Sequence, residues 1–324
     1  MTLPVAVTGP LTPAQQSSIV NLVRRAARAE ILPRFRALAQ GDISTKSGPQ
    51  DLVTSADTAA EAMIARGLAR MFPGAVILGE EASSEKTGSD KPGSAGDAGS
   101  ASLRDRAAEA ELAFVIDPLD GTWNFVNGLG VFGVILAATR YGRPIFGLIH
   151  DPLADDHVIA LSDAPARHVA RNGHVTTLTL PPAGALDGLS GYVHMAHMPQ
   201  DQQEILAPLL PRFARSGALR CSAHEYRQMA QGRVDFILSG VMTPWDHAAG
   251  VLICQRAGGV ARMLDGSDYT IGTREGHLLC ATDAATWDAL AAHFAPLAGD
   301  AADAAAPGEA SETEAPSEAA PAAG

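Results

Sequence analysis

Two stretches near the N-terminus carry apolar side chains at helical spacing. In the first stretch these side chains are Ile19, Leu22, Val23, Ala26 and Ala27, and Pro33 is expected to kink or end the helix. In the second they are Ala60, Met63, Ile64, Gly67, Leu68, Met71 and Phe72, and Pro73-Gly74 stops the pattern. The spacing predicts two amphipathic helices.

Further along the chain the pattern changes to short apolar runs, which are typical of β-strands. The runs cover residues 75–78, 114–116, 131–139, 145–150, 157–161 and 175–180. Asn172-Gly173 predicts a hairpin turn between residues 167–171 and the last run. From about residue 185 helices and strands alternate, with helices expected near 199–214, 224–232, 246–257 and 284–295, and strands at 235–238, 259–264 and 278–281.

This order of elements predicts a two-part fold. Residues 1–184 form an α+β half and residues 185–298 form an α/β half. Two segments are expected to lie outside the core. Residues 83–110 are rich in Ser, Gly, Asp and Ala and are interpreted as a flexible surface insertion. Residues 299–324 form an Ala/Pro/Glu-rich tail that is expected to be disordered.

Composition limits the class of protein. The chain has 324 residues, of which 46% are hydrophobic and 19% charged, as in a globular protein. The net charge of −12 argues against nucleic acid or a membrane as a partner, although the tail alone holds six acidic residues and no basic residue. Cys221, Cys254 and Cys280 form no C-x-x-C pair, which fits a reducing compartment. We find neither a signal peptide nor an apolar run long enough for a membrane span, so we expect a cytoplasmic protein.

The candidate chemistry lies in acidic residues at the ends of predicted elements. Asp117 and Asp120 follow the run 114–116 in the hexapeptide Asp117-Pro118-Leu119-Asp120-Gly121-Thr122, which could be a simple turn or a set of oxygen ligands for Mg²⁺. Gly79-Glu80-Glu81 follows a strand, where it could also be a solvated strand end. Asp57 and Asp246 stand where helices begin. A capping box formed by Thr54 and Asp57, and a helix N-cap at Asp246, are the plain structural alternatives.

Taken together, these segments resemble the inositol monophosphatase family of Mg²⁺-dependent, lithium-sensitive phosphatases, over about residues 15–295. The matching motifs are Asp117-Pro118-Leu119-Asp120-Gly121-Thr122-Trp123-Asn124-Phe125, Trp245-Asp246-His247-Ala248-Ala249-Gly250, Gly79-Glu80-Glu81, and Asp51-Leu52-Val53-Thr54-Ser55-Ala56-Asp57 preceded by Lys46. The resemblance implies the layered αβαβα sandwich of the inositol monophosphatase and fructose-1,6-bisphosphatase superfamily. It also implies a phosphomonoesterase that acts on a small phosphorylated substrate, possessing two to three Mg²⁺ ions and often forming a homodimer.

The resemblance assigns roles to matching positions. Glu80, Asp117 and the carbonyl group of Leu119 would hold a first Mg²⁺. Asp117, Asp120 and Asp246 would hold a second, and a third ion would lie near Glu80. The candidate catalytic residues are Asp57, Thr122 and Glu80, with Asp57 and Thr122 activating the attacking water. The backbone amides of Gly121 and Thr122 would bind the phosphate.

The substrate alcohol is less clearly marked. Related inositol phosphatases carry a Glu seven positions before the W-D aspartate, where this chain has Ser239, and small residues where it has Ala223-His224-Glu225. We therefore hypothesise that His224 or Glu225 contacts the substrate near Ser239. An alternative is that this segment only caps a helix. His194 and His197 lie near no acidic motif in the sequence and are interpreted as structural or exposed.

Several alternatives stay open at this point. The substrate could be a phosphorylated polyol such as inositol monophosphate, or instead histidinol phosphate, fructose-1,6-bisphosphate or a 3′-phosphoadenosine phosphate. A haloacid-dehalogenase-type phosphatase fails because its D-x-D-G-T motif places the acids two apart, whereas Asp117 and Asp120 are three apart. A module that binds metal or phosphate without catalysis is the remaining rival.

Overall fold

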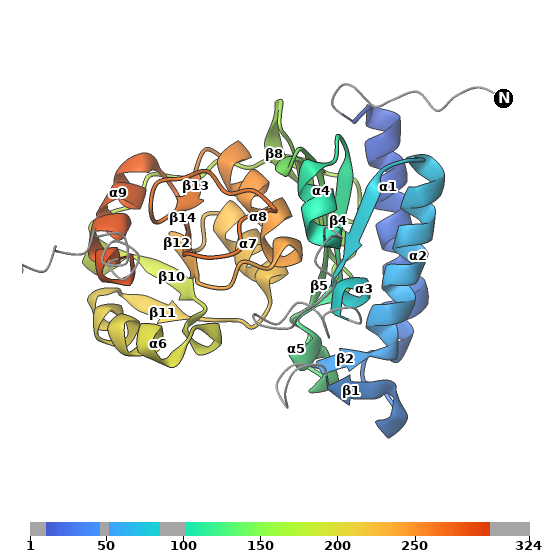
Figure 1. Cartoon of the computed structure of the whole chain (residues 1–324), viewed down its shortest axis with the longest axis horizontal. Coiled ribbons are helices and arrows are strands. Elements are labelled where there is room, and N and C mark those ends of the chain that lie inside the picture. The colour runs from blue at the N-terminus through green and yellow to red at the C-terminus, as the bar shows by residue number, and fades with distance from the viewer. Residues whose placement is uncertain (1–10, 46–51, 85–101, 299–324) are drawn as a thin grey trace, which may run out of the picture.

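The computed structural model describes residues 11–45, 52–84 and 102–298. Its main layers are two β-sheets separated and flanked by helices (Figure 1). The flexible insertion predicted at residues 83–110 lies outside the described residues at 85–101, and so does the tail that is predicted to be disordered. Lys46 and Asp51 also lie outside the described residues. Within the described residues, no helix combines the length and the apolar character that a membrane span requires.

The larger sheet has seven strands among the described residues. In spatial order they are β3 (Val76–Gly79), β4 (Ala113–Asp120), β5 (Gly133–Arg140), β6 (Arg143–Asp151), β7 (Asp156–Leu161), β8 (Ala164–Val169) and β9 (Val175–Thr177). Only the β3–β4 pair of this sheet is parallel. The hairpin predicted at Asn172-Gly173 is confirmed, because β8 and β9 pair as antiparallel strands around it.

Helices cover both faces of this sheet. On the outer face lie α1 (Pro13–Ala26) and α2 (Ser55–Met71), which confirm the two amphipathic helices (Figure 1). After α1 the chain continues as a π-helical turn at Ala27–Ile31 and a 3₁₀ turn that contains Pro33. Strand β4 is buried along its whole length, with Phe114 and Ile116 packed in the cluster of α1 and α2 and Val115 in the cluster on the opposite face. Because side chains alternate along a strand, a strand covered on both faces appears as a continuous apolar run.

Between the two sheets lie α7 (Ser222–Ala230) and α8 (Pro244–Arg256). Helix α8 approaches β6 closely at Gly147, where an added Cβ atom would lie only 2.8 Å from the carbonyl oxygen of Ala249. The smaller sheet has the order β11 (Arg215–Gly217), β10 (Ser190–Val193), β12 (Phe236–Ser239), β14 (Leu278–Ala281) and β13 (Val260–Met263). Its outer face is covered by α6 (Gln200–Leu206) and α9 (Ala284–His293) (Figure 1). The predicted αβαβα sandwich is thereby confirmed.

Two predictions about elements need correction. The segment 83–110 is not irregular throughout, because α4 (Leu103–Glu109) begins at a capping box between Ser102 and Asp105. The helix expected at 199–214 ends at Leu206 and continues as a 3₁₀ helix at Ala207–Arg212. Pro208 and Pro211 explain the change, since proline lacks the amide that an α-helix needs.

Four short strands escaped the sequence pattern. They are β1 (Ile43–Thr45), which pairs with β2 (Leu52–Thr54), and the strands β10 and β11. Each is only three or four residues long, which is too short to establish a period of two. The remaining α-helices among the described residues are α3 (Glu80–Ser84) and α5 (Thr122–Val126).

Candidate metal and phosphate site

The Asp117–Thr122 segment crosses the edge between strand and helix. Strand β4 continues through Asp120, and its pairing with β5 shifts register between Asp117 and Asp120. The strand therefore ends in the two carboxylates, as the sequence pattern predicts. The amide of Leu119 donates to Asp117 Oδ1 over 3.1 Å, and Gly121 takes a φ of 85° before α5 begins at Thr122. An added Cβ at Gly121 would lie 2.7 Å from the carbonyl oxygen of Val131, so only glycine fits this turn.

Three carboxylates from two distant parts of the chain meet here. One oxygen each from Asp117, Asp120 and Asp246 lies within 4.8 Å of the others. Asp246 comes from the first turn of α8, where the hydroxyl of Thr243 donates to it. Asp120 accepts from the amide of Ala223 over 2.5 Å and from the thiol of Cys221 over 3.0 Å, both at the start of α7.

The electrostatics of this group favour a cation. Burial, together with the neighbouring charge of Asp246, raises the pKa of Asp120 to about 7. Burial also raises the pKa of Asp246, although the hydrogen bond from Thr243 acts in the opposite direction. Buried carboxylates this close together are stable in their charged form only when a positive charge lies among them. Carboxylate oxygens are the ligands that Mg²⁺ and Ca²⁺ prefer, so the donor set fits a hard divalent cation.

Asp57 and Thr122 lie beside this group. The Thr122 hydroxyl is 3.0 Å from Asp57 Oδ1 and 2.9 Å from the carbonyl oxygen of Leu119. Asp57 Oδ2 also accepts from the amide and hydroxyl of Thr54, so the capping box proposed as a plain alternative is present and coexists with the contact to Thr122. Burial, with a smaller effect of Glu80, raises the pKa of Asp57 to about 6.

The Gly79-Glu80-Glu81 segment is shaped by a buried acid from α2. Glu61 accepts from the amides of Glu81 and Ala82 over 2.8 and 2.9 Å, and an added Cβ at Gly79 would collide with its carboxylate. Glu81 is buried, which contradicts the interpretation of this segment as a solvated strand end. Glu80 lines the same cavity as Asp117, Asp120 and Asp246. The close group of carboxylate oxygens found among the described residues contains those three aspartates and not Glu80.

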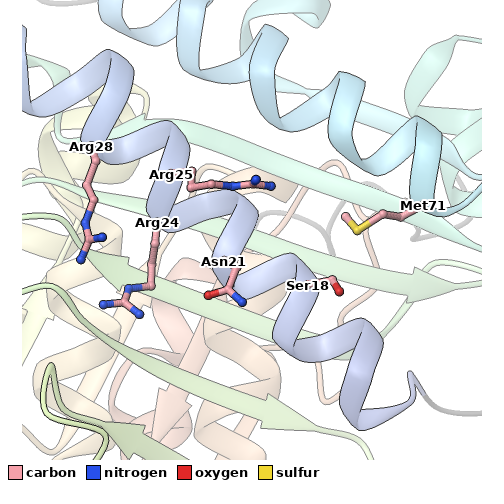
Figure 2. A pocket seen from close by; sticks show the side chains of 6 residues that line it. All are labelled: Ser18, Asn21, Arg24, Arg25, Arg28 and Met71. Carbon is pink, nitrogen blue, oxygen red and sulfur yellow. The ribbon is translucent and has the colours of Figure 1, made fainter.

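One cavity of about 1090 Å³ is bordered by Glu80, Asp117, Asp120, Thr122 and Asp246. A smaller cavity of about 510 Å³ lies on the outer side of α1 (Figure 2). Figure 2 shows Arg24, Arg25 and Arg28 along that helix, with Met71 approaching from α2. Asp155 pairs with both Arg24 and Arg28, so one of these three positive charges is already neutralised. The acidic cavity is therefore the candidate site.

The cavity wall opposite the acids differs from the sequence-based hypothesis. Ser239 lines the cavity, but His224 Nε2 lies 3.1 Å from the carbonyl oxygen of Phe132 in the protein interior. Glu225 is fully buried and contacts His194 Nε2 through Oε2. His194 and His197 both line the cavity, so the interpretation that they lie apart from the acidic residues is wrong. The strand β10 that carries His194 to this place is one of those that the sequence pattern missed.

Comparison with known proteins tests the resemblance. A family model described as "Inositol monophosphatase family" matches residues 15–298. The chain belongs to this family. Its relatives include the inositol-1-monophosphatase of Bacillus subtilis, 28% identical over 233 residues that cover 70% of this chain and 78% of that protein.

Two further members of the family have different names, although their sequence identities to this chain are similar. The inositol-1-monophosphatase SuhB of Mycobacterium tuberculosis is 32% identical over 78% of this chain and 84% of its own length. A protein of Escherichia coli named Nus factor SuhB is 29% identical over 78% of this chain and 86% of its own length. Membership of the inositol monophosphatase family is therefore shown, whereas the substrate is not.

Solved structures support the fold. The inositol monophosphatase of Thermotoga maritima has a TM-score of 0.69 and 22% identity, covering 89% of this chain and 99% of that one. An inositol monophosphatase of Zymomonas mobilis has a TM-score of 0.67 and 20% identity, covering 88% of this chain and all of that one. The layered arrangement of this chain is thus the inositol monophosphatase fold.

Proposed function

We propose that the protein is a Mg²⁺-dependent phosphomonoesterase that hydrolyses a small phosphorylated polyol, such as inositol monophosphate, with a metal-activated water. The observation that carries the proposal is the meeting of Asp117, Asp120 and Asp246 within 4.8 Å at the cavity. Such a group binds a divalent cation, and a site that faces a large cavity leaves room for a phosphate ester beside it.

Different residues of the chain would bind the metal ions and the phosphate. Asp117, Asp120 and Asp246 would hold one ion, Glu80, Asp117 and the Leu119 carbonyl another, and a third would lie near Glu80. Bound Mg²⁺ would supply charge for the phosphate oxygens and lower the pKa of a water. The amides of Gly121 and Thr122 would orient the phosphate.

Asp57 and Thr122 would take the proton of the attacking water. Their oxygens are 3.0 Å apart, and Thr54 fixes the other oxygen of Asp57. A pKa of about 6 leaves Asp57 ionised at neutral pH and still basic enough to accept a proton. Glu225 and Ser239 are proposed to contribute to the alcohol-binding part of the site, whereas the position of His224 gives it no direct contact to offer.

Known complexes in the family indicate the size of the substrate. Solved structures of SaIMPase-II with bound inositol monophosphate and with bound 2′AMP have TM-scores of 0.68 and 0.65 to this chain, at 19% and 21% identity. A phosphorylated polyol and a nucleotide therefore both belong in the test, with histidinol phosphate, fructose-1,6-bisphosphate and 3′-phosphoadenosine phosphates. The homodimer, the cytoplasmic location and the absence of a nucleic-acid partner stay predictions.

The test is phosphate release from this panel with Mg²⁺ and with EDTA. We expect EDTA to abolish release and Asp117→Asn to reduce it by about 100-fold or more, because a group that stabilises transition-state charge is lost. Asp187→Asn, at an exposed position in a 3₁₀ turn, is the matched control and should keep the parent rate. Activity that survives both EDTA and Asp117→Asn would exclude the metal-dependent mechanism. A folded protein that binds Mg²⁺ and hydrolyses nothing in the panel would favour the non-catalytic binding module.

A further inference from the structure

Arg220 has a backbone conformation that is unusual for a residue with a side chain. It stands between β11 and α7 with a φ of 55°, in the left-handed region that favours glycine. A residue other than glycine costs free energy in this region and persists there only where its surroundings fix it. Such residues are concentrated at active sites and ligand clamps, so the strain at Arg220 points to a functional side chain.

Hydrogen bonds on both sides of Arg220 fix the strained turn. The side-chain amide of Asn124, a buried residue of α5, donates to the carbonyl oxygen of Leu219 over 2.9 Å and to that of Arg220 over 3.3 Å. On the other side, the thiol of Cys221 donates to Asp120 Oδ2 over 3.0 Å. The turn is therefore held in place by bonds within the protein, at the edge of the acidic group.

The guanidinium of Arg220 lies over the ring of Trp123. Its Cζ atom is 4.2 Å from the ring centroid, which is a cation–π contact. Trp123 directly follows Thr122, whose backbone amide is proposed to bind the phosphate, so the stacked pair stands beside the proposed phosphate position. A guanidinium that rests on a ring keeps N–H donors along its edge, in a fork that matches the oxygens of a carboxylate or a phosphate.

Two kinds of charged side chain border the cavity. The acidic ones are the proposed metal ligands. Among the described residues that border it, Arg220 is the one arginine or lysine, and its side chain is exposed there. Burial lowers the pKa of His197, another residue of the cavity wall, and the positive charges of His194 and Arg220 act in the same direction. The charge of Arg220 therefore reaches into the cavity.

The position of Arg220 favours a substrate with a second negative charge. The phosphate that is cleaved already has its proposed partners in the metal ions and in the amides of Gly121 and Thr122. A guanidinium binds a further carboxylate or phosphate through charge-assisted hydrogen bonds, often two at once. A hydroxyl group of an uncharged polyol accepts a weaker bond from the same donors.

We propose that Arg220, held on Trp123, is a specificity-determining residue that binds a second anionic group, a carboxylate or a phosphate, on the alcohol part of the phosphate ester. The inference rests on the proposed phosphatase function. It narrows the substrate class from phosphates of uncharged polyols to esters that carry two anionic groups.

The experiment measures kcat/KM for two matched pairs of esters, in the full-length chain with Mg²⁺. The first pair is 6-phosphogluconate and sorbitol 6-phosphate, which carry a carboxylate and a hydroxymethyl group, respectively, at the carbon farthest from the phosphate. The second pair is fructose 1,6-bisphosphate and fructose 6-phosphate, which differ by a second phosphate. We expect Arg220→Gln to lower the ratio of kcat/KM within at least one pair about tenfold, because a hydrogen bond between charged groups is lost at an exposed site. The pair that responds identifies the anionic group.

Three variants separate ligand binding from a structural role. Arg215→Gln removes the same charge from an exposed position of β11 and is the matched control, which should leave both ratios unchanged. Arg220→Gly adopts the left-handed φ without strain, so it should unfold at no lower temperature than Arg220→Gln and still lose the preference. Arg220→Lys keeps the charge without the planar fork and should keep part of the preference.

Inositol 1-phosphate serves as the common reference substrate. If the parent hydrolyses it and both ratios stay the same in Arg220→Gln and Arg220→Gly, the inference is overturned and the phosphatase function stands. Equal losses of kcat/KM for both members of each pair would also overturn the inference, because Arg220 would then act on the cleaved phosphate or on the fold. A parent protein that hydrolyses no ester, inositol 1-phosphate included, would overturn the proposed function and the inference with it.

Discussion

Replacing Arg104 with Met should destabilise the protein strongly, because its guanidinium joins α4 to two segments that are distant in sequence. The guanidinium of Arg104 donates from Nε to the carbonyl oxygen of Ile271 over 2.7 Å and from Nη2 to that of Met242 over 2.8 Å. It also donates to the carbonyl oxygen of Thr273. These bonds tie α4 to the loop that precedes α8 and to residues 271–273, which follow in the second half.

The structure sets the size of the expected loss. Three hydrogen bonds from a charged donor would total roughly 5–9 kcal/mol if each were fully buried. Arg104 is only half-buried, and burial lowers the pKa of its guanidinium, so charging it in place already costs free energy. Because the methionine relieves that cost and water can reach some of the freed carbonyls, we expect a loss of about 3 kcal/mol. In urea this corresponds to a midpoint lower by about 1 M.

Urea unfolding followed by circular dichroism measures this loss. Arg106→Met is the matched control, since Arg106 lies on the same helix with an exposed side chain, and it should change stability by less than about 0.5 kcal/mol. Equal stabilities for the two variants would refute the reasoning, because they would mean that the three carbonyls do not depend on the guanidinium. Since Met242 stands four residues before Asp246, a weaker affinity of Arg104→Met for Mg²⁺ would extend the effect to the site.

Two further predictions concern backbone and cap. Gly121→Ala should destabilise the protein by about 2 kcal/mol more than Gly173→Ala. Both glycines have a positive φ, but of the two only Gly121 lacks room for a Cβ atom. Thermal unfolding compares the two variants, and equal losses of stability would contradict the close contact at Gly121. Asp283→Ala should cost about 1 kcal/mol at pH 7, because Asp283 caps α9 through the amide of Thr286. Burial raises the pKa of Asp283, but hydrogen bonds from Thr286 and Ala183 outweigh it and lower the pKa to about 2, below the unfolded value of about 3.9. The stabilisation by Asp283 is thus present above pH 4 and lost as the pH falls toward 2. The difference in unfolding free energy between parent and variant, measured with urea, should therefore shrink over that window. A difference that is constant from pH 7 to pH 2 would contradict the role of Asp283 as a charged cap.

The parts of the site that the sequence predicts are those whose residues are neighbours in the chain. Asp117, Leu119, Asp120 and Thr122 stand within one hexapeptide, so their proximity follows from covalent connection and a single tight turn. Asp246 and Asp57 were predictable because each begins a helix with a clear apolar pattern. The same argument explains why α1, α2 and the central strands were predicted correctly, because their burial requires a regular spacing of apolar residues along the chain.

The parts that escaped prediction depend on contacts between distant segments. His194 lies 31 residues from Glu225 and 45 from Ser239, and its strand has only four residues. Helix α4 carries one buried apolar residue of its own, Ala107, so its pattern is too weak to separate it from a loop. What holds it is the set of carbonyls that accept from Arg104, and no local pattern reveals them.

The acidic residues also connect the larger sheet with the helices that lie between the two sheets. Asp120 belongs to β4 in the larger sheet, yet its hydrogen-bond donors are Cys221 and the amide of Ala223 at α7. Asp246 reaches the same place from α8, so the three carboxylates meet only when α8 is packed against the larger sheet. A charged Asp120 is stabilised by the donors at α7 and destabilised by its burial and by Asp246. A bound cation would offset the destabilisation by burial and by Asp246 and leave the hydrogen bonds from α7 in place. It would thereby favour the packed arrangement that creates its own site.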